Sequence, residues 1–196
     1  MPASASDLTT PVLLLAMPQV LDPYFQRSVV LLLQHEEAGS LGFVLNHPTA
    51  IRIGEILKEM DLRWAGRQEV VAYRGGPVQP ELGTVLFAPV LEAGPEDTAT
   101  EILPGVAVTQ HVGDLSRLAE APPDRFRLIL GYAGWGEGQL MAEILRNDWL
   151  TVPASSDLIF AADPEEAWGA ALRSVGIDPA ALPSWVPASA SEDSAN

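Results

Sequence analysis

The sequence predicts an α+β protein in which strands and helices are mixed without strict βαβ alternation. Three observations support this class: short apolar runs bounded by turn residues, apolar residues at helical spacing, and a strongly signalled last helix. The chain has 196 residues, of which 47% are hydrophobic and 19% charged. A chain of this length buries roughly 70% of the surface that it exposes when unfolded, so a core without disulfides is expected.

Three apolar runs near the N-terminus predict strands at 12–17, 28–34 and 41–46. The second run is apolar at successive positions, which indicates that both faces of this strand are buried, as in a central strand. Residues 35–40 form a polar, glycine-containing connection that is short enough for a hairpin. The first three strands are therefore predicted to form an antiparallel meander.

The next part of the chain continues the mixed pattern. Ile53, Ile56, Leu57 and Met60 fall at i, i+3, i+4 and i+7, on one face of a short helix. Further segments then alternate irregularly, with strands predicted at 70–73, 84–88, 106–109 and 126–130 and helices at 114–120 and 137–146.

The last helix has signals at both ends. Asp163 is a predicted N-cap, Pro164 stands at the first helical position, and Glu166 completes a capping box. Gly176 lies where a glycine in the left-handed conformation ends a helix. The residues after Leu182 are small and polar, so we expect one domain over 11–182, with disordered ends at 1–10 and 183–196.

Composition excludes several classes of function. The chain contains no cysteine, which excludes disulfides, thiolate metal sites and cysteine nucleophiles. The formal charge is −15, with 11 basic and 26 acidic residues, and this balance argues against nucleic-acid binding, which depends on Lys and Arg at phosphates. The first ten residues carry no Lys or Arg, and no apolar run reaches the length of about 20 that spans a membrane. We expect a cytoplasmic protein outside the membrane.

A run of glycines between a predicted strand and a predicted helix is one candidate site. Backbone N–H groups of a turn at Gly134, Gly136 and Gly138 can hold a phosphate or a carboxylate. The spacing matches neither a dinucleotide-binding nor a Walker motif. The structural alternative is that these glycines permit positive φ and close packing of Tyr132 and Trp135.

Arg74 precedes a predicted tight turn, Gly75-Gly76-Pro77. A guanidinium beside exposed backbone donors can hold a carboxylate or phosphate. The structural alternative is a turn in which Arg74 pairs with one of the many acidic side chains of the chain.

Asp22, Arg27 and Asn46 are the third candidate group. Asp22 and Arg27 belong to a loop that enters the predicted central strand, and they are expected to line a pocket beside Asn46. The structural alternative is that Asp22 accepts hydrogen bonds from its own turn and pairs with Arg27.

The chain lacks the spacing of known catalytic and metal sites. His35, His47 and His111 show no close pairing of the kind that binds zinc, and no G-x-S-x-G serine motif occurs. We therefore predict no catalytic residue, no metal site and no cofactor.

Three stretches carry a family resemblance. They are Leu15-Ala16-Met17-Pro18 with Asp22-Pro23-Tyr24-Phe25, Arg27-Ser28-Val29-Val30, His35, Gly42 and Asn46; then Arg74-Gly75-Gly76-Pro77-Val78; then Gly131-Tyr132-Ala133-Gly134-Trp135-Gly136 with Gly138-Gln139-Leu140, Glu143, Trp149 and Leu150. In order and spacing they resemble the bacterial AlgH/YqgE family over about residues 11–182.

The resemblance implies an α+β protein whose branched sheet is curled into a pseudo-barrel with flanking helices. It implies no known reaction, catalytic residue or cofactor. The family carries a label as transcriptional regulators, which the charge of this chain does not favour. His47 stands where relatives often carry a basic residue, so anion binding is not implied at that position.

Two hypotheses of function follow. The first is a non-enzymatic regulator or adaptor that acts through a protein partner. The alternative is a binding protein or enzyme for a phosphorylated or carboxylated small molecule, held by Arg74, Gly75, Gly76 and the 134–138 turn.

Overall fold

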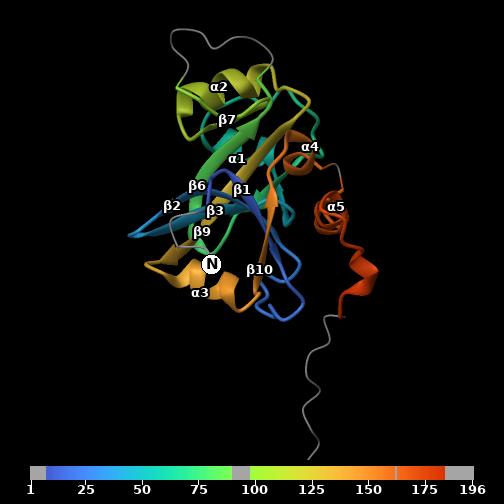
Figure 1. Cartoon of the computed structure of the whole chain (residues 1–196). Helices are drawn as coiled ribbons and strands as arrows, with labels where there is room; N and C mark the ends of the chain where they lie inside the picture. The colour runs from blue at the N-terminus through green and yellow to red at the C-terminus, as the bar shows by residue number, and fades with distance from the viewer. Residues whose placement is uncertain (1–7, 90–97, 162, 184–196) are drawn as a thin grey trace, which may run out of the picture.

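The computed structural model describes residues 8–89, 98–161 and 163–183. Within them the chain forms one connected ten-stranded sheet with short helices on its faces (Figure 1). The strands are β1 (Val12–Ala16), β2 (Val29–Glu36), β3 (Gly39–Val44), β4 (Pro48–Arg52), β5 (Val71–Arg74), β6 (Val78–Phe87), β7 (Thr100–Leu103), β8 (Val106–Thr109), β9 (Phe126–Gly136) and β10 (Trp149–Pro153). The helices are α1 (Ile53–Glu59), α2 (Val112–Glu120), α3 (Gln139–Leu145), α4 (Ser156–Ile159) and α5 (Ala167–Ser174), followed by the 3₁₀ turn η1 (Pro179–Ala181).

The sheet is curled and branched, as the family resemblance implies. Its main path runs β10-β1-β2-β3-β9-β6-β8-β7, and every pair along this path is antiparallel. The branch consists of β4 and β5, and β5 lies parallel to β9. One edge of β9 is therefore shared, because β5 pairs with Ile129 and Leu130 and β3 pairs with residues 133–136.

The predicted N-terminal meander is confirmed. β1, β2 and β3 pair in sequence order, and the first half of β2 is buried on both faces. Leu31 contributes to a core under α4 and α5, whereas Leu32 contributes to a core on the opposite face beside α3. A third core lies between α1, α2 and the far part of the sheet, where Leu57 and Leu115 pack on Val85. Figure 1 shows α2 at the upper end of the sheet, α3 at its lower end, and α4 and α5 on its right side.

Two glycine-rich segments differ from the sequence prediction. The glycines at 131–136 belong to β9, which continues to Gly136, whereas the sequence predicts that the strand ends at 130 and is followed by a turn. Gly75-Gly76-Pro77 does not join two paired strands: β5 and β6 lie on opposite edges of β9, so the chain crosses over β9 at this point. The crossing is possible because Gly75 and Gly76 have no side chains, so their backbone can pass close to the backbone of β9.

The crossing brings backbone against backbone. A Cβ atom on Gly75 would lie 2.3 Å from the carbonyl oxygen of Gly131, and one on Gly76 would lie 2.2 Å from the backbone of Tyr132. The N–H of Gly75 donates to the carbonyl of Leu130, 2.7 Å away, and its carbonyl accepts from Val44, 2.8 Å away. These bonds join the branch strand to both β9 and β3.

The last helix begins later than predicted. Asp163 accepts the N–H of Glu165 at 2.9 Å, but this capped turn precedes α5, which starts at Ala167 with Glu166 before it. The predicted helix end is confirmed: Gly176 has φ 78°, and the N–H of Ile177 returns to the carbonyl of Leu172. The predicted disordered ends lie outside the described residues, except for residues 8–10 and 183.

Asp114 ties α2 to β8. Its side chain is 3% exposed and accepts hydrogen bonds from the hydroxyls of Thr98 and Thr109, at 2.6 and 2.7 Å, and from Arg117. Burial raises the pKa of this carboxyl, but the hydrogen bonds outweigh burial and lower the pKa to about 2.

We expect Gly75→Ala to lower the free energy of unfolding by about 3 kcal/mol or more, because the added methyl group meets backbone that has no room to move. Gly83→Ala is the matched control, since its Cβ would make only an ordinary contact, 3.6 Å from Leu128. Urea unfolding of both variants measures the difference. Equal stability of the two variants would show that the crossing is looser than described.

Asp114→Asn should destabilise the fold in a pH-dependent way. The folded pKa lies below the usual 3.8, so the charged carboxylate contributes stability above pH 4, and this contribution falls as the pH drops toward 2. The deficit of the variant should be about 1–2 kcal/mol at pH 6 and shrink at pH 2–3. Unfolding of Asp124→Asn, an exposed control, should show no comparable pH-dependent deficit.

Candidate functional site

An open pocket of about 470 Å³ lies beside the strand crossing. It falls in the size range of small-molecule sites. Tyr24 and Arg74 stand on its polar side, and its apolar wall consists of Pro48, Ile51, Pro77, Pro80 and Leu130. The pocket thus draws on the loop before β2, on β4, on both ends of the crossing segment and on β9. We call it the Tyr24–Arg74 pocket.

Arg74 presents an exposed guanidinium to this pocket. Its Cζ lies 5.7 Å from the centre of the Tyr24 ring, within the range of a cation–π contact. Among the ion pairs between described residues, none includes Arg74. Its backbone N–H donates to the carbonyl of His47 at 2.8 Å, which fixes where the side chain starts.

His47 is half-buried next to Arg74. Burial lowers the pKa of this imidazole, the positive charge of Arg74 lowers it further, and a hydrogen bond with the backbone of Gln26 opposes both effects. His47 is therefore neutral near pH 7, and Arg74 is the charged residue among those that line the pocket.

Asp22 organises the loop that carries Tyr24. Its carboxylate accepts the N–H of Tyr24 at 2.8 Å, and its carbonyl accepts the N–H groups of Phe25 and Gln26. This is the turn role that the sequence left open for Asp22. Asp22 positions Tyr24 and does not line the pocket itself.

Arg27 and Asn46 lie on the other side of this loop. The guanidinium of Arg27 stands over the indole of Trp168, 5.4 Å from the ring centre. Asn46 is buried and accepts the N–H of Val29 at 2.8 Å, while its amide donates to the carbonyl of Arg27 at 2.9 Å and to that of Pro164 at 3.4 Å. Its side chain joins the loop to the segment before α5, and neither residue lines the pocket.

The predicted glycine donors do not come together in one site. Gly76 lines the Tyr24–Arg74 pocket, but Gly75 has its N–H bonded to Leu130. Gly134 lines a separate hollow that shares no residue with this pocket. The N–H of Gly136 donates to Gln139 at 3.0 Å, and Gly138 is the left-handed residue before the short helix α3.

Arg127, a buried arginine, shows how a guanidinium with a structural role is placed in this chain. Arg127 is 5% exposed, lies over the ring of Tyr73 at 4.7 Å, and donates to the carbonyls of Leu45 and Ala161. Its side chain joins β9 to two loops. Arg74 differs because its guanidinium faces solvent and a hollow.

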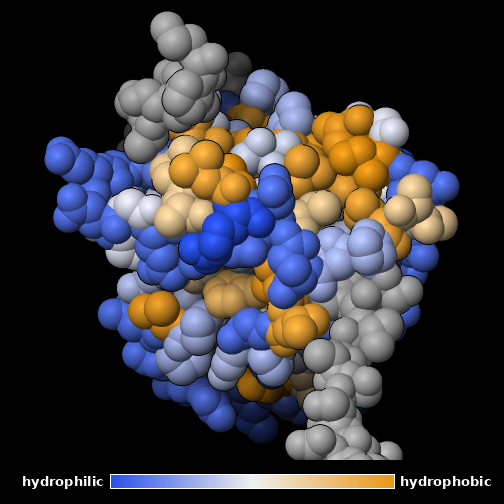
Figure 2. Space-filling model, turned by 60° about the horizontal axis from the view of Figure 1, so that its bottom comes forward, coloured by the Kyte–Doolittle hydropathy of each residue, from blue (hydrophilic) through white to orange (hydrophobic). Residues whose placement is uncertain are grey.

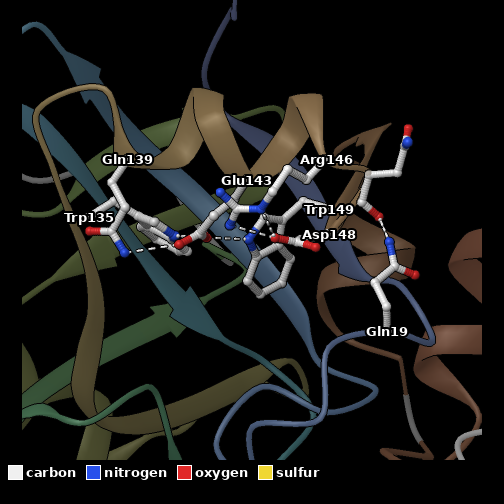
Figure 3. A network of polar contacts seen from close by, with 8 residues as sticks. Gln19, Trp135, Gln139, Glu143, Arg146, Asp148 and Trp149 are labelled. Carbon is white, nitrogen blue, oxygen red and sulfur yellow. Dashed lines mark hydrogen bonds and ion pairs between the residues drawn. The ribbon is translucent and has the colours of Figure 1, made fainter.

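Glu143 is the centre of a polar network that joins α3 to β9 and β10 (Figure 3). One of its carboxylate oxygens accepts the indole N–H groups of Trp135 and Trp149, at 2.9 and 2.8 Å, and the other accepts the amide of Gln139 at 2.9 Å. These bonds link β9, α3 and β10. The GYAGWG stretch and the Gln, Glu and Trp after it are thus connected by one carboxylate.

The network also supports the pocket through Phe25. The ring of Phe25 packs edge-on to Trp149, 5.8 Å between centroids, and 6.4 Å from Trp135. Its neighbour in the loop is Tyr24. The two indoles that Glu143 orients therefore pack against the loop that carries Tyr24.

Sequence reasoning identified Arg74 but gave no role to Tyr24 or His47. Both stand in stretches that were singled out, next to Asp22 and Asn46. His47 comes near Arg74 through the pairing of β4 with β5, and Tyr24 through a side-chain contact over 50 positions, so no local pattern indicates either.

The described residues offer few signs of other sites. Within the described ranges, no three His, Asp or Glu side chains are grouped in a way that could hold a metal ion. In the same part of the chain, no helix is long and apolar enough to cross a membrane.

Glu143→Gln should lower the free energy of unfolding by about 1–3 kcal/mol, because the charge that three donors share is lost and an N–H₂ group faces Gln139. Glu137→Gln, an exposed neighbour, is the matched control and should change stability little. Urea unfolding followed by tryptophan fluorescence measures both. Equal stability of the two variants would contradict the role of Glu143.

Comparisons with known proteins agree with this architecture. The model of the AlgH-like family matches residues 13–180. A UPF0301 protein of Myxococcus xanthus is 41% identical over 177 residues, which are 88% of this chain and 93% of that protein. A UPF0301 protein of Cupriavidus metallidurans is 44% identical over 170 residues, which are 84% of this chain and 87% of that protein.

Solved structures share the fold. The solution structure of the AlgH protein from Pseudomonas aeruginosa aligns with a TM-score of 0.72 at 35% identity, over 91% of this chain and 94% of that chain. A crystal structure of a Corynebacterium diphtheriae protein aligns with a TM-score of 0.71 at 22% identity, over 88% and 90% of the two chains, and shows the same fold. With its family match, its relatives and its curled, branched sheet in agreement, the chain belongs to the AlgH-like family.

Proposed function

We propose that this AlgH-like protein is a non-catalytic binding protein that recognises an anionic group, a carboxylate or a phosphate, in the Tyr24–Arg74 pocket. One observation carries the proposal: the guanidinium of Arg74 is exposed at a hollow and rests on an aromatic ring. The chain has 26 acidic side chains, yet among the described residues none of them pairs with Arg74.

The electrostatics of the chain make this arrangement informative. A charge of −15 surrounds any cation with nearby carboxylates, and five arginines of the described part are indeed paired with Asp or Glu. A guanidinium keeps five N–H donors in a planar fork that fits a carboxylate or phosphate. An external anion is the partner that Arg74 can take up.

A second candidate is the regulator or adaptor hypothesis, in which the anionic group belongs to a protein partner. Leu21, Tyr24 and Ile51 are 50%, 43% and 44% exposed, and two of them line the pocket. Figure 2 shows hydrophobic patches between hydrophilic residues on the lower end of the molecule. Exposed apolar side chains next to a cation are typical of a protein-binding surface. We further propose a cytoplasmic location, on the sequence grounds given above.

Arg74→Gln should weaken binding of acetate and inorganic phosphate at least about tenfold, because a charge-assisted contact is lost. NMR chemical-shift titration at low salt measures both probes. Arg67→Gln, an exposed arginine whose change gives the same net charge, is the matched control. Binding that is equal in Arg74→Gln and in the control would refute the proposed site.

The two candidate functions predict different results when the protein is crosslinked in its native host. If a protein partner is bound, crosslinking should recover one protein with the wild-type chain and with Arg67→Gln, but not with Arg74→Gln. Recovery that does not depend on Arg74 would count against the regulator or adaptor hypothesis at this site.

A further inference from the structure

We infer that the Tyr24–Arg74 pocket selects a monocarboxylate with an apolar body over phosphate. This inference rests on the proposed function and names the ligand class of the same site.

The donors at the pocket suit a single negative charge. Arg74 is the charged residue of the lining, and His47 beside it is neutral near pH 7 because burial and Arg74 lower its pKa. A phosphate carries about 1.5 to 2 negative charges at pH 7 and presents three acceptor oxygens. The nearby backbone donor of Gly75 is already bonded to Leu130, and Arg74 is the one charged donor that a phosphate would meet in the lining of this pocket.

The guanidinium is presented in a way that fits a planar partner. The Tyr24 ring covers the guanidinium at 5.7 Å. Its N–H groups lie in the plane of the fork, and a carboxylate meets such an edge with two parallel hydrogen bonds. Among the described residues, no hydrogen bond or ion pair occupies the guanidinium N–H groups of Arg74.

The apolar wall provides the rest of the contact. Pro48, Ile51, Pro77, Pro80 and Leu130 line the hollow that continues from Arg74. Prolines keep this wall stiff, because their rings fix the backbone. Each CH₂ group that a ligand buries against such a wall raises its affinity about fourfold. A ligand with a carboxylate and an apolar body uses both parts of the pocket, whereas phosphate uses one.

The test compares acetate, 3-methylbutanoate, phenylacetate, phenylacetamide and inorganic phosphate by NMR chemical-shift titration at pH 7.5 and constant ionic strength. Affinity should rise at least about tenfold from acetate to phenylacetate. Phenylacetamide, which lacks the charge, should bind at least about tenfold more weakly than phenylacetate, and so should phosphate.

Two variants test the charged part and the apolar part of the pocket separately. Arg74→Gln should weaken binding of every anion, whereas Ile51→Ser should weaken phenylacetate at least about threefold more than acetate, because Ile51 belongs to the apolar wall of the pocket. Ile51 is 44% exposed on an outer strand, so its replacement leaves the fold intact. Arg67→Gln again controls for net charge.

The outcomes separate this inference from the proposal beneath it. Phosphate that binds as tightly as phenylacetate, with both lost in Arg74→Gln, overturns the selectivity and leaves the anion site standing. If phenylacetate binds no better than acetate, the selectivity is likewise overturned and the anion site still stands. Anion binding that survives in Arg74→Gln overturns both.

A last arm distinguishes the source of the carboxylate. N-acetyl-glycyl-phenylalanine presents the same chemistry as a chain terminus. Tighter binding of this dipeptide than of phenylacetate, lost on amidation, assigns the carboxylate to the end of a protein partner, and the reverse order assigns it to a free acid. Both results support a monocarboxylate.

Discussion

The close approach of the backbone of Gly75-Gly76 to that of Gly131-Tyr132 is the constraint on which the rest depends. No side chain fits between these segments, so the chain can pass directly over β9 and place β5 and β6 on its two edges. The crossing splits the sheet into a main path and a branch. It also sets Arg74 on one side of β9 with Pro77 and Pro80 close by, so the pocket is a direct product of the crossing.

Buried polar groups hold the parts around this crossing in place. Glu143 orients two indoles, Asn46 joins the Tyr24 loop to the segment before α5, and Arg127 joins β9 to two loops. Each of these side chains is engaged by several partners, and such groups fix geometry because an unsatisfied buried donor or acceptor is unfavourable. Arg74 differs from these residues because its guanidinium is exposed at the pocket. The buried groups stabilise the fold, whereas Arg74 is available to a ligand.

The sequence predicts well what depends on local pattern. The meander, the doubly buried β2, the short helices and the glycine that ends α5 all follow from periodicity and capping. The branch does not, because parallel pairing of β5 with β9 joins residues more than fifty positions apart. Strands β4, β7 and β10 were not predicted: β4 is largely exposed, and Pro153 ends the short β10. At the site, Arg74 was predicted from its glycines, but Tyr24 and His47 became its neighbours only through tertiary structure.

The pairing of β10 with β1 has a consequence for how the chain is made. The N-terminal strand finds its second neighbour only at residues 149–153, so one edge of the meander stays open during most of synthesis on the ribosome. Contacts that span so much of the chain slow folding, and open strand edges favour association with other chains. In a nascent chain the free edge of β1 is therefore open to other strands until residues 149–153 have been made.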